Sequence, residues 1–157
     1  MMKRMALMAL VALAPLGLAQ GSDRGAAKLA VGGKTFSIDY GRPGLKGRDM
    51  LGQAKVGDEW RMGSNAATTW KGDGDVAFGA VNVAQGEYQL RARRDGEDKW
   101  TLLFKQEGKT VAEVALALSP VKDSVEALTI DLREAKGGGE FDMRWGTTAL
   151  KAAFKLR

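Results

Sequence analysis

Apolar and polar residues alternate with a period of two through most of the chain after residue 33, and this pattern limits the fold more than any other feature. Successive side chains of a β-strand point to opposite faces, so the pattern is that of strands with one face in a core. In residues 34–40, for example, Phe36, Ile38 and Tyr40 share one face. The predicted strands cover residues 34–40, 86–93, 99–105, 110–118, 127–134, 140–145 and 149–157, with a further strand starting over 68–70.

Turn residues separate these strands at intervals of about ten residues, as in β-sandwiches and small barrels. Residues 110–118 are rich in Ala and Leu, which also permits a helix, but their alternation and their neighbours favour a strand. We therefore predict an all-β fold, an antiparallel β-sandwich or flattened barrel of roughly eight to ten strands. The predicted turns and loops contain Asp73-Gly74, Gln85-Gly86, Asp95-Gly96, Glu107-Gly108 and the glycine run 137–139.

The first 19 residues predict a secretory signal peptide. Two positive residues precede an uncharged and mostly apolar run, which ends in small residues of the kind that signal peptidase reads. The run is short for a membrane span and contains Pro15; the alternative is an uncleaved anchor. We expect cleavage after Ala19, export to the periplasm or the extracellular space, and no membrane span in the mature chain. Residues 20–33 then form a flexible leader or edge segment before a single β-rich domain over 34–157.

The composition excludes several chemistries. The chain has no histidine and no cysteine, which rules out Ser-His-Asp and Cys-His catalysis, histidine-ligated metals, thiolate redox chemistry and disulfides. We accordingly predict no cofactor and no metal site. Without the signal peptide the chain has 22 basic and 19 acidic side chains, a net charge of +3, and no long basic run. We therefore expect no nucleic-acid partner.

Two chemistries based on oxygen ligands or carboxylates remain open. The segment KGDGD, residues 71–75, resembles a piece of a calcium loop, although a hairpin turn explains it equally. Glycan hydrolysis by two acids is also compatible with the composition, but no spacing selects a pair. This lack of a defined pair favours a protein that is not an enzyme. The carboxylates from which a pair would come are Asp39, Asp58, Glu59, Glu140 and Asp142.

Two segments break the alternation and concentrate side chains that recognise ligands. They are YGRPGLKGR, residues 40–48, and EWRMGSNAATTW, residues 59–70. Arginine presents a planar fork to carboxylate or phosphate, while Tyr, Trp and Asn suit sugars and other polar ligands. The alternative is that the arginines pair with the nearby Asp39, Asp58 or Glu59 and hold two crossing loops together. The candidate ligand-binding residues are Tyr40, Arg42, Arg48, Trp60, Arg61, Asn65 and Thr68.

These same segments resemble a known family. YGRPGLKGR, WRMGSNAAT, AQGEYQL and KWTLLF follow the order and approximate spacing of motifs in the exported bacterial family catalogued as domain of unknown function 2911. The chain departs from the family pattern at Ala66, where a glutamate is common, and at Lys105 or Gln106, where an asparagine is common. The resemblance implies an extracytoplasmic β-rich domain and implies no particular activity.

Three functions are consistent with the sequence. The first is an exported, non-enzymatic β-sandwich that binds an unknown small polar or anionic ligand or an envelope component. The second is a carboxylate-dependent hydrolase acting on glycans, and the third is a purely structural envelope domain. Convergence of the candidate side chains on an open concavity would favour the first, and a pair of carboxylates in a cleft would favour the second.

Overall fold

The computed structural model describes residues 24–157, and the signal peptide predicted over residues 1–19 lies outside them. The described residues form strands and turns, which confirms the all-β prediction, and none belongs to a helix that could cross a membrane. The strands are β1 (Arg24–Val31), β2 (Lys34–Gly41), β3 (Glu59–Trp60), β4 (Thr69–Gly72), β5 (Val76–Phe78), β6 (Val81–Val83), β7 (Gly86–Arg94), β8 (Trp100–Gln106), β9 (Lys109–Ala135) and β10 (Gly138–Leu156).

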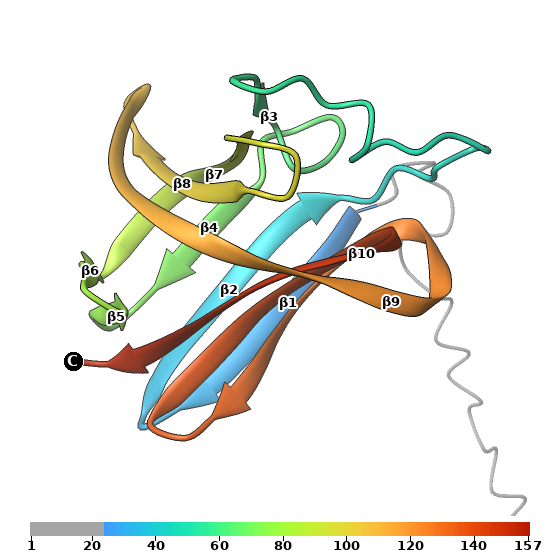
Figure 1. Cartoon of the computed structure of the whole chain (residues 1–157). Coiled ribbons are helices and arrows are strands. Elements are labelled where there is room, and N and C mark those ends of the chain that lie inside the picture. The colour runs from blue at the N-terminus through green and yellow to red at the C-terminus, as the bar shows by residue number, and fades with distance from the viewer. Residues whose placement is uncertain (1–23) are drawn as a thin grey trace, which may run out of the picture.

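The strands form one antiparallel sheet in the order β1-β2-β4-β7-β8-β9-β10-β5-β6, with β3 paired to β7 (Figure 1). Within residues 24–157 no ladder joins β1 to β6, so the sheet is open and not closed into a barrel. The segment expected to be a leader or edge segment contributes residues 24–31 as strand β1, at one edge of the sheet.

The long strand β9 folds this sheet back on itself. Its residues 109–116 pair with β8, whereas residues 117–120, 125 and 129–135 pair with β10. The β9–β10 pairing shifts register around Gly146, whose φ of 62° suits glycine, and both strands change direction there. In Figure 1 β9 crosses the molecule, turns, and returns beside β10. The two halves of the sheet thereby face each other in a sandwich-like arrangement.

The core between the two halves is a cluster of aromatic rings. The ring centroid of Trp70 in β4 lies 5.5 Å from that of Phe104 in β8 and 5.7 Å from that of Phe154 in β10. Phe36 of β2 and Phe78 of β5 also pack on Trp70. Aromatic pairs of this kind add about 0.5–1.5 kcal/mol each beyond the burial of their surface. The cluster therefore fixes the first half of the sheet to the second.

The period of two predicts the buried faces well. In residues 110–118 the side chains of Ala112, Val114 and Leu116 are buried, which confirms a strand in place of the helix that their composition permits. The structure corrects two strand boundaries. The segments 110–118 and 127–134, predicted as separate strands, belong to the single strand β9, which continues through Pro120. The segments 140–145 and 149–157, also predicted as separate strands, belong to the single strand β10.

The predicted loop over 137–139 is also too long. Only Gly137 lies in the turn, and Gly138 and Gly139 begin β10. A Cβ atom on Gly138 would lie 2.7 Å from the Cα of Lys155, and one on Gly139 would lie 2.6 Å from the ring of Phe154. These two glycines therefore allow the start of β10 to pack against its own end, which is a contact that turn propensity does not reveal.

One charged residue is buried, although the alternation of its strand places it on the outward face. Asp142 is 1% exposed, and it lies opposite Asp131 in the β9–β10 ladder. Arg133 and Arg144 each contact both carboxylates, with Arg144 2.6 Å from Asp131 and 3.6 Å from Asp142. The Oδ1 of Asp142 and the Nε of Arg144 have no hydrogen-bond partner among the described residues. We call these four residues the charge quartet.

Candidate ligand-binding site

The two motif segments cross each other with their backbones in contact. A Cβ atom on Gly41 would lie 2.7 Å from the amide nitrogen of Ser64, and one on Gly63 would lie 2.8 Å from the carbonyl oxygen of Gly41. Met62 is fully buried at the crossing with a φ of 59°, a conformation that costs a non-glycine residue about 1–2 kcal/mol. The crossing thus depends on glycine at two positions and holds one strained residue in place.

Tyr40 and Arg42 fasten the first segment to β9. The Tyr40 hydroxyl accepts a hydrogen bond of 2.9 Å from the backbone N–H of Ile130. Arg42 donates from Nε to the carbonyl of Leu128 at 3.0 Å and from a terminal nitrogen to the hydroxyl of Thr129 at 3.1 Å. Both side chains therefore bind the chain itself, across more than eighty residues of sequence.

Arg61, Asn65 and Thr68 organise the second segment. Thr68 is 1% exposed, and its hydroxyl donates to the carbonyl of Met62 at 2.8 Å. Arg61 is exposed and donates to the carbonyl of Asn65, which itself has a φ of 63°. These contacts close the loop between β3 and β4.

Two of the three acidic residues considered as partners of these arginines bind other cations. Asp39 pairs with Arg24 of β1, and a carboxylate oxygen of Glu59 lies 2.7 Å from the Nζ of Lys105 in β8. The alternative in which the motif arginines pair with Asp39 or Glu59 does not form, because Arg24 and Lys105 already bind these carboxylates. Arg42 instead uses a carbonyl and a hydroxyl oxygen.

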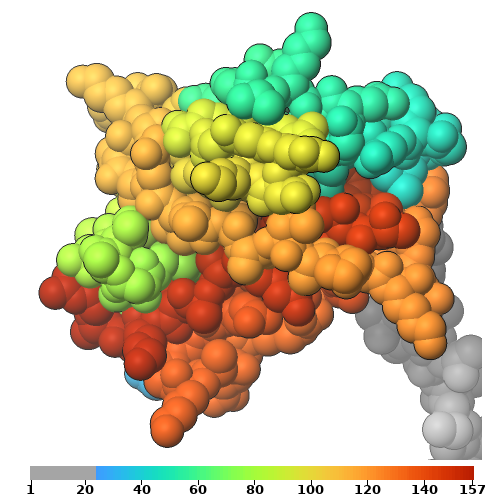
Figure 2. All heavy atoms as spheres, in the orientation of Figure 1, coloured from blue at the N-terminus to red at the C-terminus, as the bar shows by residue number. Residues whose placement is uncertain are grey.

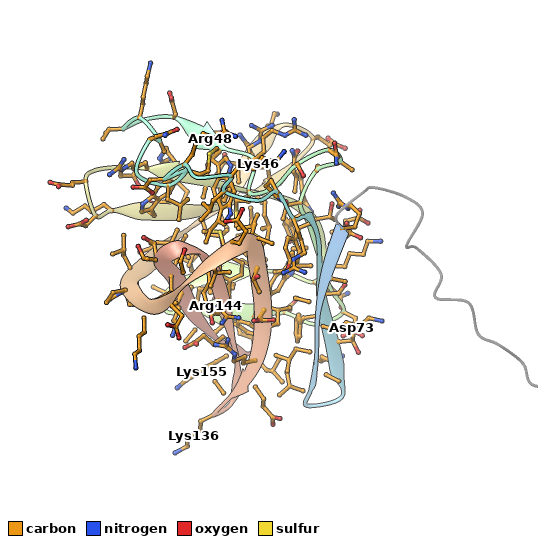
Figure 3. The ribbon with its side chains drawn as sticks, turned by 90° about the vertical axis from the view of Figure 1, so that its right-hand side faces the viewer. Lys46, Arg48, Asp73, Lys136, Arg144 and Lys155 are labelled. Carbon is orange, nitrogen blue, oxygen red and sulfur yellow. The ribbon has the colours of Figure 1, made fainter. Side chains whose placement is uncertain are left out.

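Arg48 lies apart from the other candidates, in the exposed loop between β2 and β3. Its backbone N–H donates to the carbonyl of Leu45 at 3.1 Å. Figure 3 shows Arg48 and Lys46 at the end of the molecule opposite Lys136, which lies in the β9–β10 turn. The seven candidates therefore do not converge on one concavity.

Trp60 alone among those seven lines a hollow between the β2–β3 loop and the start of β8, which we call the Trp60 hollow. The hollow has a volume of about 310 Å³. Figure 2 shows the cyan and green surface of this loop meeting the yellow surface of the β7–β8 connection along the top of the molecule. The lining residues are Met50, Leu51, Gln53, Ala54, Asp58, Glu59, Trp60 and Trp100.

The indole of Trp60 is held in a fixed orientation. It stacks on Trp145 with a centroid separation of 5.5 Å and an angle of 13° between the ring planes. Trp145 is 3% exposed, and its Nε1 donates to the carbonyl of Glu126 at 3.1 Å. Trp60 thus gives the hollow an aromatic wall that a second, buried indole supports.

Arg94 shapes the other side of the hollow. Its guanidinium lies 5.9 Å from the ring centroid of Trp100 and donates to the carbonyls of Gly52 and Ala54, at 3.1 Å and 2.7 Å. It forms no ion pair with a carboxylate of residues 24–157; its remaining bonds go to carbonyls of the β7–β8 connection. Arg94 therefore sets the path of the loop and leaves a positive charge beside the hollow.

The polar side chains at the hollow differ in how far they are engaged. The carboxylate of Glu59 is occupied by Lys105 on the outer face of the sheet. Asp58 is exposed and makes no ion pair with another described residue. Gln53 is exposed as well. Asp58 and Gln53 are consequently the side chains that can bind a ligand at the rim.

A second concavity lies on the outer face of β4, β7 and β8. This outer groove has a volume of about 700 Å³, and side chains such as Thr69, Gln89 and Lys105 line it. Tyr88 also reaches the groove; burial raises its pKa, and the negative charge of Asp75 adds to this shift. Because the groove is wide and has little aromatic surface, it resembles a solvated sheet face more than a ligand pocket.

Most of the carboxylates considered for calcium or acid chemistry serve structural roles. Asp73 accepts from the backbone N–H of Thr35 at 2.7 Å, and Asp75 accepts from that of Gln85 at 2.7 Å, so both carboxylates hold the β4–β5 connection in place. This connection is not the hairpin turn considered for KGDGD, because β4 and β5 do not pair with each other. No group of three metal-binding side chains occurs in the part of the chain that the structure describes. Asp39, Glu59 and Asp142 are ion-paired.

Outside these sites, hydrogen bonds from Arg93 and Thr101 lower the pKa of Asp95.

Sequence reasoning missed most of the Trp60 hollow. Met50, Gln53 and Asp58 come from a loop without periodicity, which gives no sign of where its side chains lie. The role of Arg94 could have been found from the sequence, because Arg94 stands on the same, inward face of β7 as Leu90 and Ala92. A charged residue at an apolar position of a strand indicates a specific partner.

Comparison with known proteins agrees with the motifs. No curated protein and no solved structure matches the chain. The family model described as "Protein of unknown function (DUF2911)" matches residues 22–154, which include both motif segments and the residues that line the Trp60 hollow. The chain therefore belongs to this family of unknown function.

Proposed function

We propose that the protein is an exported, non-enzymatic β-domain that binds a small polar ligand in the Trp60 hollow. The observation that carries the proposal is the aromatic wall formed by Trp60 on its support Trp145, next to the carboxylate of Asp58, which forms no ion pair within residues 24–157. A concave, mostly apolar site with a few polar groups at its rim is the usual form of a small-molecule site. Export rests on the predicted signal peptide.

The outer groove and the hydrolase hypothesis have less support. The groove lacks the aromatic surface of the hollow, and its Lys105 is already paired with Glu59. Of the carboxylates considered for glycan hydrolysis, Asp58 and Glu59 share the hollow, but Glu59 is turned to the opposite face of the sheet by this pairing. Glu59 is therefore not available in the hollow as the second acid.

A thermal-shift screen of the chain from Gln20 onward tests the proposal. Sugars, nucleotides, lipid headgroups and divalent ions are added separately, since any ligand that binds only the folded state raises the unfolding midpoint. We expect a shift that Asp58→Asn reduces and that Gln89→Ala, in the outer groove, leaves unchanged. Loss of the shift in Gln89→Ala alone would place the ligand in the groove, and a flat screen would favour a structural domain.

The structural role is a second candidate because of one specific observation. Tyr40, Arg42 and Thr68 use their polar atoms on the chain's own backbone or side chains, so these motif residues hold the fold together. A domain that serves only as an envelope component requires nothing more. This candidate predicts that no compound in the same screen raises the unfolding midpoint of the protein or of a variant with a substitution in the hollow.

A further inference from the structure

We infer that the ligand of the Trp60 hollow is a neutral saccharide ring, an inference that rests on the proposed function. The first step is the shape of the wall. Trp145 covers one face of the Trp60 indole, and Trp60 also lines the hollow. A flat, rigid indole surface best accepts another flat or chair-shaped face that carries C–H groups, because such faces make continuous contact with it.

The second step is the hydrogen-bonding character of the rim. The free carboxylate of Asp58 only accepts hydrogen bonds, and Gln53 can both accept and donate. A ligand that satisfies Asp58 must therefore supply O–H or N–H donors. Both hydroxylated rings and organic ammonium ions meet this requirement, so the rim alone does not separate them.

The third step is the charge around the hollow, which separates these two classes. Arg94 stands over the ring of Trp100 at 5.9 Å, and its positive charge is not neutralised by an ion pair within residues 24–157. This guanidinium occupies the cation site on Trp100 and repels a second cation. Asp58 in turn repels an anion. A neutral ligand with several hydroxyl groups avoids both penalties.

The size of the hollow agrees with a single ring. Its volume of about 310 Å³ lies at the low end of the range of about 300–1,000 Å³ that ligand sites occupy. Trp100 is 3% exposed, so it forms the floor and leaves Trp60 as the stacking surface. The hollow thus suits one terminal or isolated sugar unit better than an extended chain.

Isothermal titration of the chain from Gln20 onward tests the ligand class. The probes are glucose, N-acetylglucosamine, galactose, choline and acetate. We expect at least one sugar to bind and the two charged probes not to bind. Trp60→Ala should weaken that binding by about tenfold or more, and Trp60→Phe, which keeps an aromatic face, should weaken it less. Gln89→Ala serves as the control in the outer groove, and circular dichroism confirms that each variant is folded.

The remaining outcomes distinguish the inference from the proposed function. Binding of choline or acetate that depends on Trp60, without sugar binding, would overturn the saccharide and leave the hollow as a ligand site. Sugar binding that Gln89→Ala abolishes and Trp60→Ala does not would overturn the assignment to this hollow. No binding by any of the five probes at millimolar concentration would overturn the saccharide, and the thermal-shift screen with nucleotides, lipid headgroups and divalent ions would then decide the proposed function.

Discussion

Arg42 and Arg48 belong to one short motif, yet the structure gives them different environments. Arg42 is half-buried and makes two hydrogen bonds to β9, whereas Arg48 is exposed in the β2–β3 loop. The motif thus contains one residue that holds the fold and one that does not. The sequence shows two arginines on a constrained loop, but the partner of Arg42 lies more than eighty residues away and carries no local signature.

The change of Arg42 to lysine should therefore be costly. Lysine keeps the charge but loses the planar fork, so it cannot reach the Leu128 carbonyl and the Thr129 hydroxyl together. We expect Arg42→Lys to lower the free energy of unfolding by about 1–3 kcal/mol. Arg48→Lys is the matched control and should stay within about 0.5 kcal/mol. Urea denaturation measures both; equal effects of the two variants would contradict the role of Arg42.

The charge quartet gives a second prediction at this scale. Asp142 is 1% exposed and depends on Arg133 and Arg144 for its ion pairs. Replacing both arginines with methionine leaves a buried carboxylate unpaired, which should cost about 3–5 kcal/mol. Adding Asp142→Leu removes that charge and should recover most of the loss. A triple variant as unstable as the double variant, in chemical denaturation, would show that the arginines act through packing alone.

At the scale of single elements, alternation predicts the strands and their buried faces because it depends only on neighbouring residues. The inward residues of β2, β7 and β8 are buried as expected. Turn chemistry also predicts the hairpin at Glu107-Gly108, where both residues have positive φ. The length of β9 was not predictable, because Pro120 and the polar residues after it lack the period. The pairs that Pro120 and Val125 form with β10 flank these residues within the strand.

Gly137 and Gly138, at the turn from β9 into β10, allow a test of the close packing between the start and the end of β10. Gly138→Ala places a methyl group against the backbone near Lys155, at 2.7 Å from its Cα. Because backbone atoms cannot move aside as a flexible side chain does, we expect a loss of about 1–3 kcal/mol in the free energy of unfolding. The adjacent Gly137 has a φ of 76° and open space around it, so Gly137→Asn should be nearly neutral. Thermal unfolding of both variants makes the comparison, and a stable Gly138→Ala would refute the close packing.

At the scale of the whole molecule, the all-β class followed from the sequence and the candidate site largely did not. Trp60 was identified because it interrupts the alternation. Its neighbours in the hollow come from three separate regions, the β2–β3 loop, β3 and the start of β8, and their meeting depends on how Arg94 holds that loop. Such a meeting is a property of the folded chain, and no window of the sequence contains it.

The last prediction concerns which part of the N-terminal region the fold needs. Strand β1 begins at Arg24, pairs along its whole length with β2, and its Arg24 contacts Asp39. Removal of the predicted signal peptide after Ala19 leaves this strand complete, so a chain that begins at Gln20 should unfold cooperatively. A chain that begins at Lys34 lacks β1 and exposes the edge of β2, which should lower its unfolding midpoint and promote association. Intact mass of the exported protein should show Gln20 as its first residue. A first residue beyond Arg24, or equal midpoints for the two chains, would contradict the assignment of β1 to the folded domain.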